Sequence, residues 1–269
     1  MEPKYRNTTF QVSNVLTYLL EQNPTWAIPE IQRPFVWDAK KVRSLIASMF
    51  LGFPVGSVMI WKGQGVRARL IGQKRKVEGE VDLVIDGQQR LTSIKILFEG
   101  GTVATEKGDK LIRIQFNPLI EACDGSFEVL KAAKPKAGWA IVSEAFTAKS
   151  ITDYIAEYKK VNKSLSKDEV YFAEKSLVEL SKLTNYSIGC IEIFSNVDID
   201  EAAEIFVRIN STGTPLKQGD FIMTLLELGN SSIKTSIQSF VDKIRKSTHA
   251  RIFQPKSGDI LSSLVRYTM

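Results

Sequence analysis

Five consecutive residues, Asp86-Gly87-Gln88-Gln89-Arg90, combine side chains that suit the binding of a phosphate group. They follow an apolar run at residues 81–85 that predicts a buried strand, and they open a predicted helix at residues 88–98. The first N–H groups of a helix have no partner within the helix, and they lie at the positive end of its dipole. Because such a helix start attracts anions, we expect an anion site at this turn.

Each residue of the turn has a possible role in that site. Gly87 allows a tight turn that brings the backbone close to a ligand, and Arg90 offers a planar guanidinium for phosphate oxygens. Gln88 and Gln89 supply amides that can orient a phosphate or a water molecule. Asp86 could bind Mg²⁺ or position an attacking water. The structural alternative is that Asp86 only caps the helix and Arg90 only pairs with it. Packing gives no evident reason for two adjacent glutamines, and this favours the phosphate site.

A second segment holds polar side chains in a stiff loop. Gln32 and Arg33 lie between Pro29 and Pro34. The two prolines suppress helix formation and stiffen the chain, so they fix where Arg33 points. The alternative is a surface arginine of no special function.

A third segment begins on a predicted helix that carries Arg208 and runs into a polar loop from Asn210 to Thr214. Gly213 allows a positive φ, and the amide and hydroxyl groups can bind a phosphate, a sugar or a base. Taken alone, this segment is better explained as an ordinary helix end followed by a turn.

A basic stretch at residues 62–76 contains no acidic side chain and several glycines, so we expect an exposed loop or hairpin. A solvated surface hairpin and a contact with the DNA backbone explain it equally well. Its basic residues are Lys62, Arg67, Arg69, Lys74, Arg75 and Lys76.

Hydrophobic periodicity predicts an α/β first half and a mostly helical second half, which we divide into domains at residues 1–150 and 151–269. Strands are expected at residues 26–28, 55–61, 81–85, 111–116, 139–142 and 187–194. Helices are expected at residues 13–22 with Ser13 as the cap, 39–51 with Asp38 as the cap, 88–98, 127–132, 151–161, 167–183, 200–209, 218–228, 232–245 and 261–269. The last helix ends with the chain, which suggests a domain of a longer protein.

Composition excludes several classes of protein. The chain has 269 residues, a net charge of +6 and a pI of about 9.1, which favours anionic partners. Its two cysteines cannot build a disulfide framework or a four-ligand zinc site. A single histidine, His249, argues against a catalytic triad and a histidine-metal nuclease. No P-loop or Rossmann glycine motif occurs. The first residues lack a signal peptide, and we expect a cytoplasmic protein without membrane spans.

Taken together, the three polar segments resemble the N-terminal domain of GmrSD-type modification-dependent restriction endonucleases. The resemblance covers about residues 10–228, and its most specific element is Asp86-Gly87-Gln88-Gln89-Arg90. The supporting residues are Ile28, Pro29, Gln32, Arg33, Trp37, Phe53, Pro54, Leu91, Thr92, Ile205, Phe206, Asn210, Gly213 and Leu216.

The resemblance implies a fold and a set of site residues. The family core is similar to the ParB and sulfiredoxin fold, in which a Gly-x-x-Arg element holds a nucleotide phosphate, and Gly87 and Arg90 match that element. The implied catalytic residues are Asp86, Gln89 and Arg90, with Asp86 also as the ligand of Mg²⁺. The implied nucleotide-binding residues are Gln32, Arg33, Gly87, Gln88, Arg90, Arg208, Asn210 and Gly213.

The resemblance also implies a function. The chain would bind and hydrolyse a nucleoside triphosphate, and it would regulate a histidine-dependent nuclease domain, absent from this chain, that cuts modified phage DNA in antiviral defence. One alternative is a module that binds modified DNA without catalysis of its own, and another is a regulatory partner with an inactive site. The oligomeric state and the preferred nucleotide are left open.

Overall fold

A mixed sheet of seven strands forms the centre of the computed structural model, which describes residues 2–20, 25–29, 34–64, 68–69, 71–73, 76–77 and 80–210. The strand order is β1-β12-β3-β6-β2-β4-β5. The pairs β12–β3 and β2–β6 are parallel and the other neighbours are antiparallel. The strands are β1 (Tyr5–Gln11), β2 (Trp26–Pro29), β3 (Val58–Gln64), β4 (Ala68–Arg69), β5 (Lys76–Val77), β6 (Val81–Asp86) and β12 (Ser187–Ile193).

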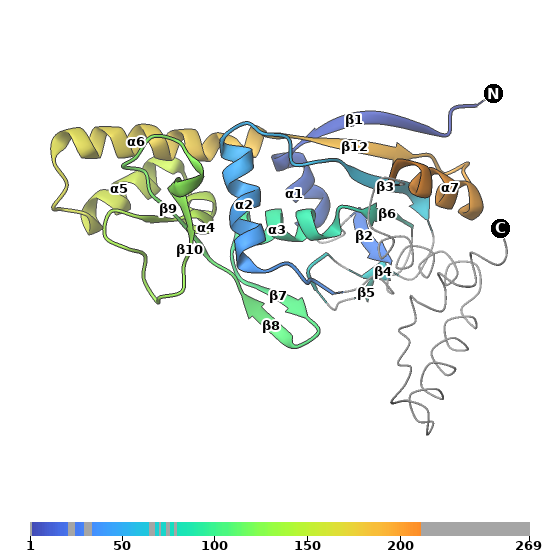
Figure 1. The fold of residues 1–269 in the computed structure, drawn as a ribbon, viewed down its shortest axis with the longest axis horizontal. Helices are drawn as coiled ribbons and strands as arrows, with labels where there is room; N and C mark the ends of the chain where they lie inside the picture. Colours follow the sequence, from blue (N-terminus) through green and yellow to red (C-terminus); the bar gives the residue numbers. More distant parts are fainter. Residues whose placement is uncertain are drawn as a thin grey trace, which may run out of the picture.

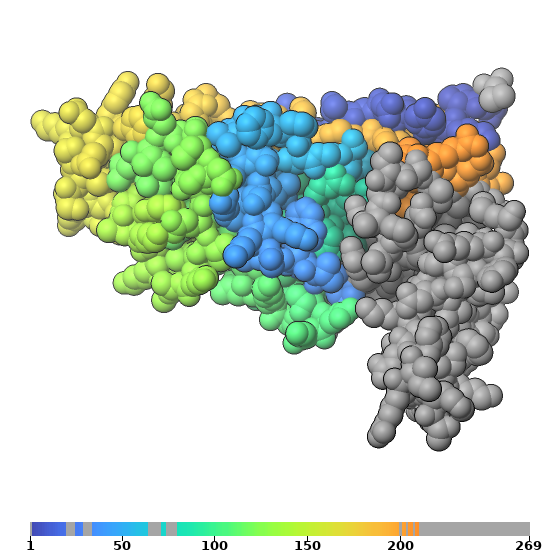
Figure 2. Space-filling model, viewed as in Figure 1, coloured from blue at the N-terminus to red at the C-terminus, as the bar shows by residue number. Residues whose placement is uncertain are grey.

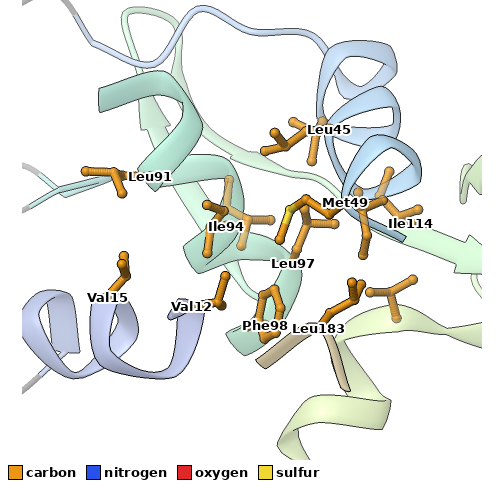
Figure 3. Packing of buried hydrophobic residues seen from close by; sticks show 14 of the residues in the cluster. Val12, Val15, Leu45, Met49, Leu91, Ile94, Leu97, Phe98, Ile114 and Leu183 are labelled. Carbon is orange, nitrogen blue, oxygen red and sulfur yellow. The ribbon is translucent and has the colours of Figure 1, made fainter. Parts of the chain in front are cut away.

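Helices cover both faces of this sheet (Figure 1). On one face lie α1 (Val12–Leu20), α2 (Ala39–Phe50) and α3 (Gln88–Glu99), which bury one set of alternating strand side chains. On the other face α7 (Ile199–Asn210) packs against the intervening set. This alternation follows from the period of two residues in a strand. Figure 3 shows side chains of α1, α2 and α3, among them Val15, Leu45 and Ile94, pointing toward one another in the larger core.

A smaller group of elements continues this core at one end of the molecule (Figure 1). A three-stranded sheet, in the order β10-β9-β11, is followed by three helices, after which the chain returns along β12 to the main sheet, between β1 and β3. Before this group, the chain forms a separate two-stranded sheet of β7 (Thr102–Thr105) and β8 (Gly108–Leu111). The elements of the group are β9 (Ile114–Phe116), η1 (Asp124–Ser126), β10 (Phe127–Val129), β11 (Ala140–Ile141), α4 (Val142–Thr147), α5 (Ile151–Val161), α6 (Lys167–Ser181) and η2 (Lys182–Asn185).

The predicted fold class is confirmed: the chain is mixed α/β, and from residue 151 to residue 210 it is mostly helical. The predicted cap of α2 is confirmed as well, because Asp38 Oδ1 accepts a hydrogen bond from the Lys41 backbone N–H at 2.8 Å. The likeness of the core to the ParB fold and the domain division at residue 150 stay predictions. The helices expected at residues 218–228, 232–245 and 261–269 lie outside the described residues.

Three local predictions were wrong. Ser13 does not cap α1, because β1 runs directly into a helix that begins at Val12. The helix expected at residues 127–132 is the strand β10, in which Phe127 pairs with Phe116 and packs against Phe50. The strand expected at residues 111–116 is two strands, since β8 ends at Leu111 and β9 begins at Ile114. In the second and third cases, pairing with a neighbouring strand decided the outcome. Within the described residues, no helix has the length and apolar character needed to span a membrane.

Candidate functional site

The junction between β6 and α3 forms the tight turn that the sequence predicts. Asp86 ends β6 opposite Met59 of β3, and α3 begins at Gln88. Between them Gly87 has a φ of 94°, in the left-handed region that glycine adopts readily. A Cβ at this position would lie 2.7 Å from Val58 Cγ1. The turn therefore requires glycine for both its backbone conformation and its contact with β3.

The guanidinium of Arg90 is fixed beside this turn. Its Nη2 lies 3.2 Å from Asp86 Oδ2, and its Nη1 donates a hydrogen bond to the Val55 carbonyl at 3.2 Å. The side chains of Arg90 and Asp86 are 17% and 28% exposed. Gly56 has a φ of 82°, and a Cβ there would overlap Arg90 Nη1. The segment of Val55 and Gly56 thus wraps the guanidinium closely and leaves part of it accessible to a ligand.

Asp86 does not cap α3. The N-cap residue is Gly87, which has no side chain to accept from the N–H groups of the first turn. The structural alternative for this segment was that Asp86 caps the helix and Arg90 pairs with Asp86. The ion pair is present, and the cap is not. The result is a helix start without a side-chain cap next to a half-buried ion pair, and the uncapped helix start favours an anion at this place.

Gln89 has a structural role that the sequence did not reveal. Its side-chain Oε1 accepts hydrogen bonds from the backbone N–H groups of Val36 at 2.9 Å and Trp37 at 3.2 Å. Its Nε2 donates to the Pro34 carbonyl at 3.3 Å. The expectation that packing gives no reason for this glutamine was wrong, because the side chain is buried and its amide holds the segment before α2. Gln88 is also buried.

These hydrogen bonds join two segments that the sequence analysis selected separately. Pro34 follows Gln32 and Arg33 in the chain, and Gln89 holds Pro34 at the start of α3. The structure thus brings the end of the proline-flanked segment to the Asp86–Arg90 turn. Gln32 and Arg33 themselves lie outside the described residues.

Residues 16–227 match the family model described as GmrSD restriction endonuclease, N-terminal domain. The chain belongs to this family. The match includes the β6–α3 turn and the segment held by Gln89. Membership implies a restriction-system module whose partners are DNA and a separate nuclease domain. No curated protein matches the chain.

The third polar segment of this GmrSD-type domain is only partly described. Arg208 lies in the last turn of α7, is exposed and pairs with Glu204 of the same helix. α7 packs on the face of the sheet opposite to α3, through Ala202 and Phe206. The described contacts therefore do not bring Arg208 to Arg90. Asn210 ends α7, and Gly213 lies outside the described residues.

Lys62 belongs to a network of charges across four strands. Its Nζ lies 2.7 Å from Asp82 Oδ2 and 3.5 Å from Glu192 Oε1, and Glu192 also pairs with Arg6. Burial alone would lower the pKa of Lys62, but the hydrogen bonds and charges of Asp82 and Glu192 outweigh it and raise that pKa. The carboxylates of Asp82 and Glu192 thus offset the charge of Lys62, which was one of the residues predicted to contact DNA.

The described strands in the rest of the basic stretch agree with the hairpin that the sequence predicted as one possibility. β4 and β5 are antiparallel, and Arg69 lies opposite Lys76. Arg67, Lys74 and Arg75 lie outside the described residues. A contact of this hairpin with DNA stays a prediction.

The metal ligand predicted for the GmrSD-type site is a single carboxylate. Across the described ranges, no group of three or more histidine, cysteine, aspartate or glutamate side chains could hold a metal ion. Mg²⁺ commonly binds through one or two carboxylates together with substrate phosphates and waters. The single carboxylate of Asp86 is compatible with an ion bound in that way.

Sequence reasoning missed two residues of the site, Val55 and Gly56, which contact the guanidinium of Arg90. Gly56 did carry a signal. An isolated glycine within an apolar, β-branched run often marks the close approach of another group to the backbone.

Proposed function

We propose that this domain binds a nucleoside triphosphate at the start of α3 and hydrolyses it, and that turnover regulates a separate nuclease in an antiviral, modification-dependent restriction system. The observation that carries the proposal is the fixed, partly exposed guanidinium of Arg90 beside a helix start that has no side-chain cap. Two sources of positive charge therefore belong to the same turn, and both favour a phosphate group.

Arg90 can bind a phosphate while it keeps its present partners. A guanidinium has five N–H donors in a fixed plane, more than the two hydrogen bonds that Arg90 makes with Asp86 and Val55. Those two bonds hold the plane of the guanidinium in one orientation, and the backbone of Gly56 lies close against Arg90 Nη1. A side chain that is already oriented loses little entropy on binding, so it is well suited to stabilise charge on a phosphoryl oxygen.

Asp86 is the proposed metal ligand and the proposed guide for the attacking water. A Mg²⁺ ion held by Asp86 and by the triphosphate would neutralise charge on the phosphate oxygens. Asp86 also balances Arg90 in the absence of a nucleotide, and its side chain is exposed enough to reach a ligand.

Gln89 is proposed to position the site. All three of its described hydrogen bonds go to the backbone of Pro34, Val36 and Trp37, which favours this role over direct contact with a water molecule. By this role Gln89 would keep Gln32 and Arg33 next to the nucleotide.

The remaining predicted residues complete the proposed nucleotide site. Gly87 brings the backbone N–H groups of the helix start toward the phosphates, and Gln88 lies next to them in the first turn. The resemblance to the family implies that Arg208, Asn210 and Gly213 also contact the nucleotide. The described contacts of α7 do not bring Arg208 to Arg90, so the proposal does not depend on this third segment.

The first experiment is nucleotide binding and turnover by the purified chain. Each of the four ribonucleoside triphosphates is tested with Mg²⁺, with and without DNA, beside Asp86→Ala and Arg90→Ala. We expect turnover of at least one nucleotide, its loss in Asp86→Ala, and loss of binding in an Arg90→Ala protein that is still folded. Unchanged nucleotide binding in a folded Arg90→Ala protein would contradict the proposal.

A DNA-binding module without catalysis is the second candidate. It is supported by the DNA partner that the family implies and by the basic hairpin that contains Arg69 and Lys76. In that case the chain would bind DNA with an affinity that falls steeply with salt, and it would turn over no nucleotide.

A further inference from the structure

A groove of about 880 Å³, whose lining includes no residue of the β6–α3 turn, lies between the first turns of α2 and the chain from β10 to residue 136. Its walls include Lys40 and Arg43 on one side and Lys131 and Lys134 on the other. Figure 2 shows α2, in blue, beside the green surface to which β10 belongs. We call this the basic groove.

The charge of the basic groove is not balanced. Five basic and two acidic side chains line it, and the acidic ones are already engaged. Asp38 caps α2, and Glu128 pairs with Lys136. Arg43 binds Asp124 through two contacts, at 2.6 and 2.7 Å.

Three lysines are left over. Within the described part of the chain, no carboxylate forms an ion pair with Lys40, Lys131 or Lys134, and all three residues are exposed. Three ammonium groups on facing walls create a positive field that attracts a polyanion.

Hydrogen bonds from two side chains fix the backbone of the loop that carries Lys131 and Lys134. Arg113 donates to the carbonyls of Ala132 at 2.7 Å and Ala133 at 3.2 Å. The buried side chain of Gln115 accepts from the backbone N–H of Lys136 at 3.1 Å. These contacts present the lysines from a formed loop, so little chain entropy is lost when a ligand binds.

We propose that the basic groove binds the phosphodiester backbone of DNA. Lysines act as point charges toward phosphates, and contacts to the backbone do not depend on base sequence. The family supplies DNA as a partner of the chain, and this favours DNA over an acidic protein segment. The proposal is independent of nucleotide binding at Arg90, because it uses other residues. The two sites nevertheless adjoin, since the groove begins at Asp38 and Gln89 holds the preceding residue, Trp37.

The test compares two triple variants of the full chain. The groove variant is Lys40→Gln, Lys131→Gln and Lys134→Gln. The control variant, with the same change of charge, is Lys163→Gln, Lys167→Gln and Lys175→Gln, three exposed lysines of α6 and the loop before it. The dissociation constant for a labelled DNA duplex is measured without nucleotide between about 50 and 200 mM salt.

We expect weaker binding by the groove variant and a smaller salt dependence. Each phosphate contact contributes about 0.9 to the slope of log K against log salt, so the slope should fall by up to about 2.7. The control variant should keep the wild-type slope, and both variants should keep the wild-type melting temperature because the changed residues are exposed.

Three results would overturn the assignment. The first is no DNA binding by the wild type. The second is equal affinity and equal slope for the groove and control variants. If a Lys74→Gln, Arg75→Gln variant then weakened binding, the basic stretch at residues 62–76 would be the DNA contact instead. The third is binding of poly-glutamate that the groove variant loses while its DNA binding is kept, since this would identify an acidic protein partner. Because nucleotide is absent from the assay, none of these results depends on the β6–α3 site.

Discussion

Gln89 Oε1 accepts a hydrogen bond from the backbone N–H of Val36 at 2.9 Å, across 53 positions of the chain. Together with the bonds to Pro34 and Trp37, it ties the segment before α2 to the start of α3. The amide of one side chain thus supplies the hydrogen-bond partners of three backbone groups in an irregular segment. Buried or half-buried backbone groups need such partners, so the position is sensitive to the shape and polarity of the side chain.

Replacing Gln89 should separate its positioning role from a catalytic one. Gln89→Ala leaves the N–H groups of Val36 and Trp37 without this acceptor, and we expect the free energy of unfolding to fall by about 1–3 kcal/mol. Gln89→Glu can still accept both hydrogen bonds, but it loses the donation to the Pro34 carbonyl and buries a charge, so we expect it to lose stability as well. Denaturant titration measures both effects. A Gln89→Glu protein of nearly normal stability that binds nucleotide but does not turn it over would instead indicate direct contact with the reacting groups.

Gly56 should be required for the placement of Arg90. Gly56→Ala puts a methyl group onto Arg90 Nη1, and its φ of 82° adds a backbone cost of about 1–3 kcal/mol. Gly52→Ala is the matched control, because Gly52 has a φ of 75° but nothing within 4 Å of its Cβ position. Both variants should lose stability, and only Gly56→Ala should also weaken nucleotide binding when measured by calorimetry. An equal nucleotide affinity in the two variants would contradict the proposed placement.

The two cysteines should differ in their reaction with thiol reagents. Cys123 is exposed, whereas Cys190 is buried in β12. Burial is the main cause that raises the pKa of Cys190 to about 12, and the nearby Glu192 adds to it. Since the thiolate is the reactive form, native protein near pH 8 should be modified at Cys123 alone. Mass spectrometry after alkylation gives the count, and a denatured sample should show two modifications. Rapid modification of Cys190 in native protein would mean that β12 opens readily.

The success of the sequence analysis depended on how local each feature was. The strand, glycine turn and helix at Asp86–Arg90 were predicted because neighbouring residues determine them. The cap of α2 at Asp38 was predicted for the same reason. The anchoring role of Gln89 was missed because its partners lie 52 to 55 positions away. The wrong helix at residues 127–132 has a similar origin, since only pairing with β9 makes that segment a strand.

Long-range pairing also explains what was not predicted about charge. The pair of Lys62 with Glu192 joins β3 to β12, and the intervening 129 residues include the whole smaller group of elements. The basic character of the stretch at residues 62–76 was evident from composition, whereas the carboxylates that offset Lys62 come from other strands. The basic groove was missed because its charges are not contiguous in the sequence. Its lysines are scattered over Lys40, Lys131 and Lys134 and become one surface only in the fold.

The last prediction concerns Asp86 and follows from its two opposed effects on a nucleotide. Without metal, the carboxylate occupies part of the Arg90 guanidinium and repels a phosphate, so it should weaken binding. With Mg²⁺, it should hold the ion and support turnover. Asp86→Asn keeps the size of the side chain and removes the charge. We therefore expect this variant to bind nucleotide in EDTA at least as tightly as the wild type, and to lose both the stimulation by Mg²⁺ and the turnover. Calorimetry with and without the ion, beside a phosphate-release assay, measures all three. A marked loss of metal-free affinity in a folded Asp86→Asn protein would show that Asp86 holds Arg90 in place, and that metal binding is not its main contribution.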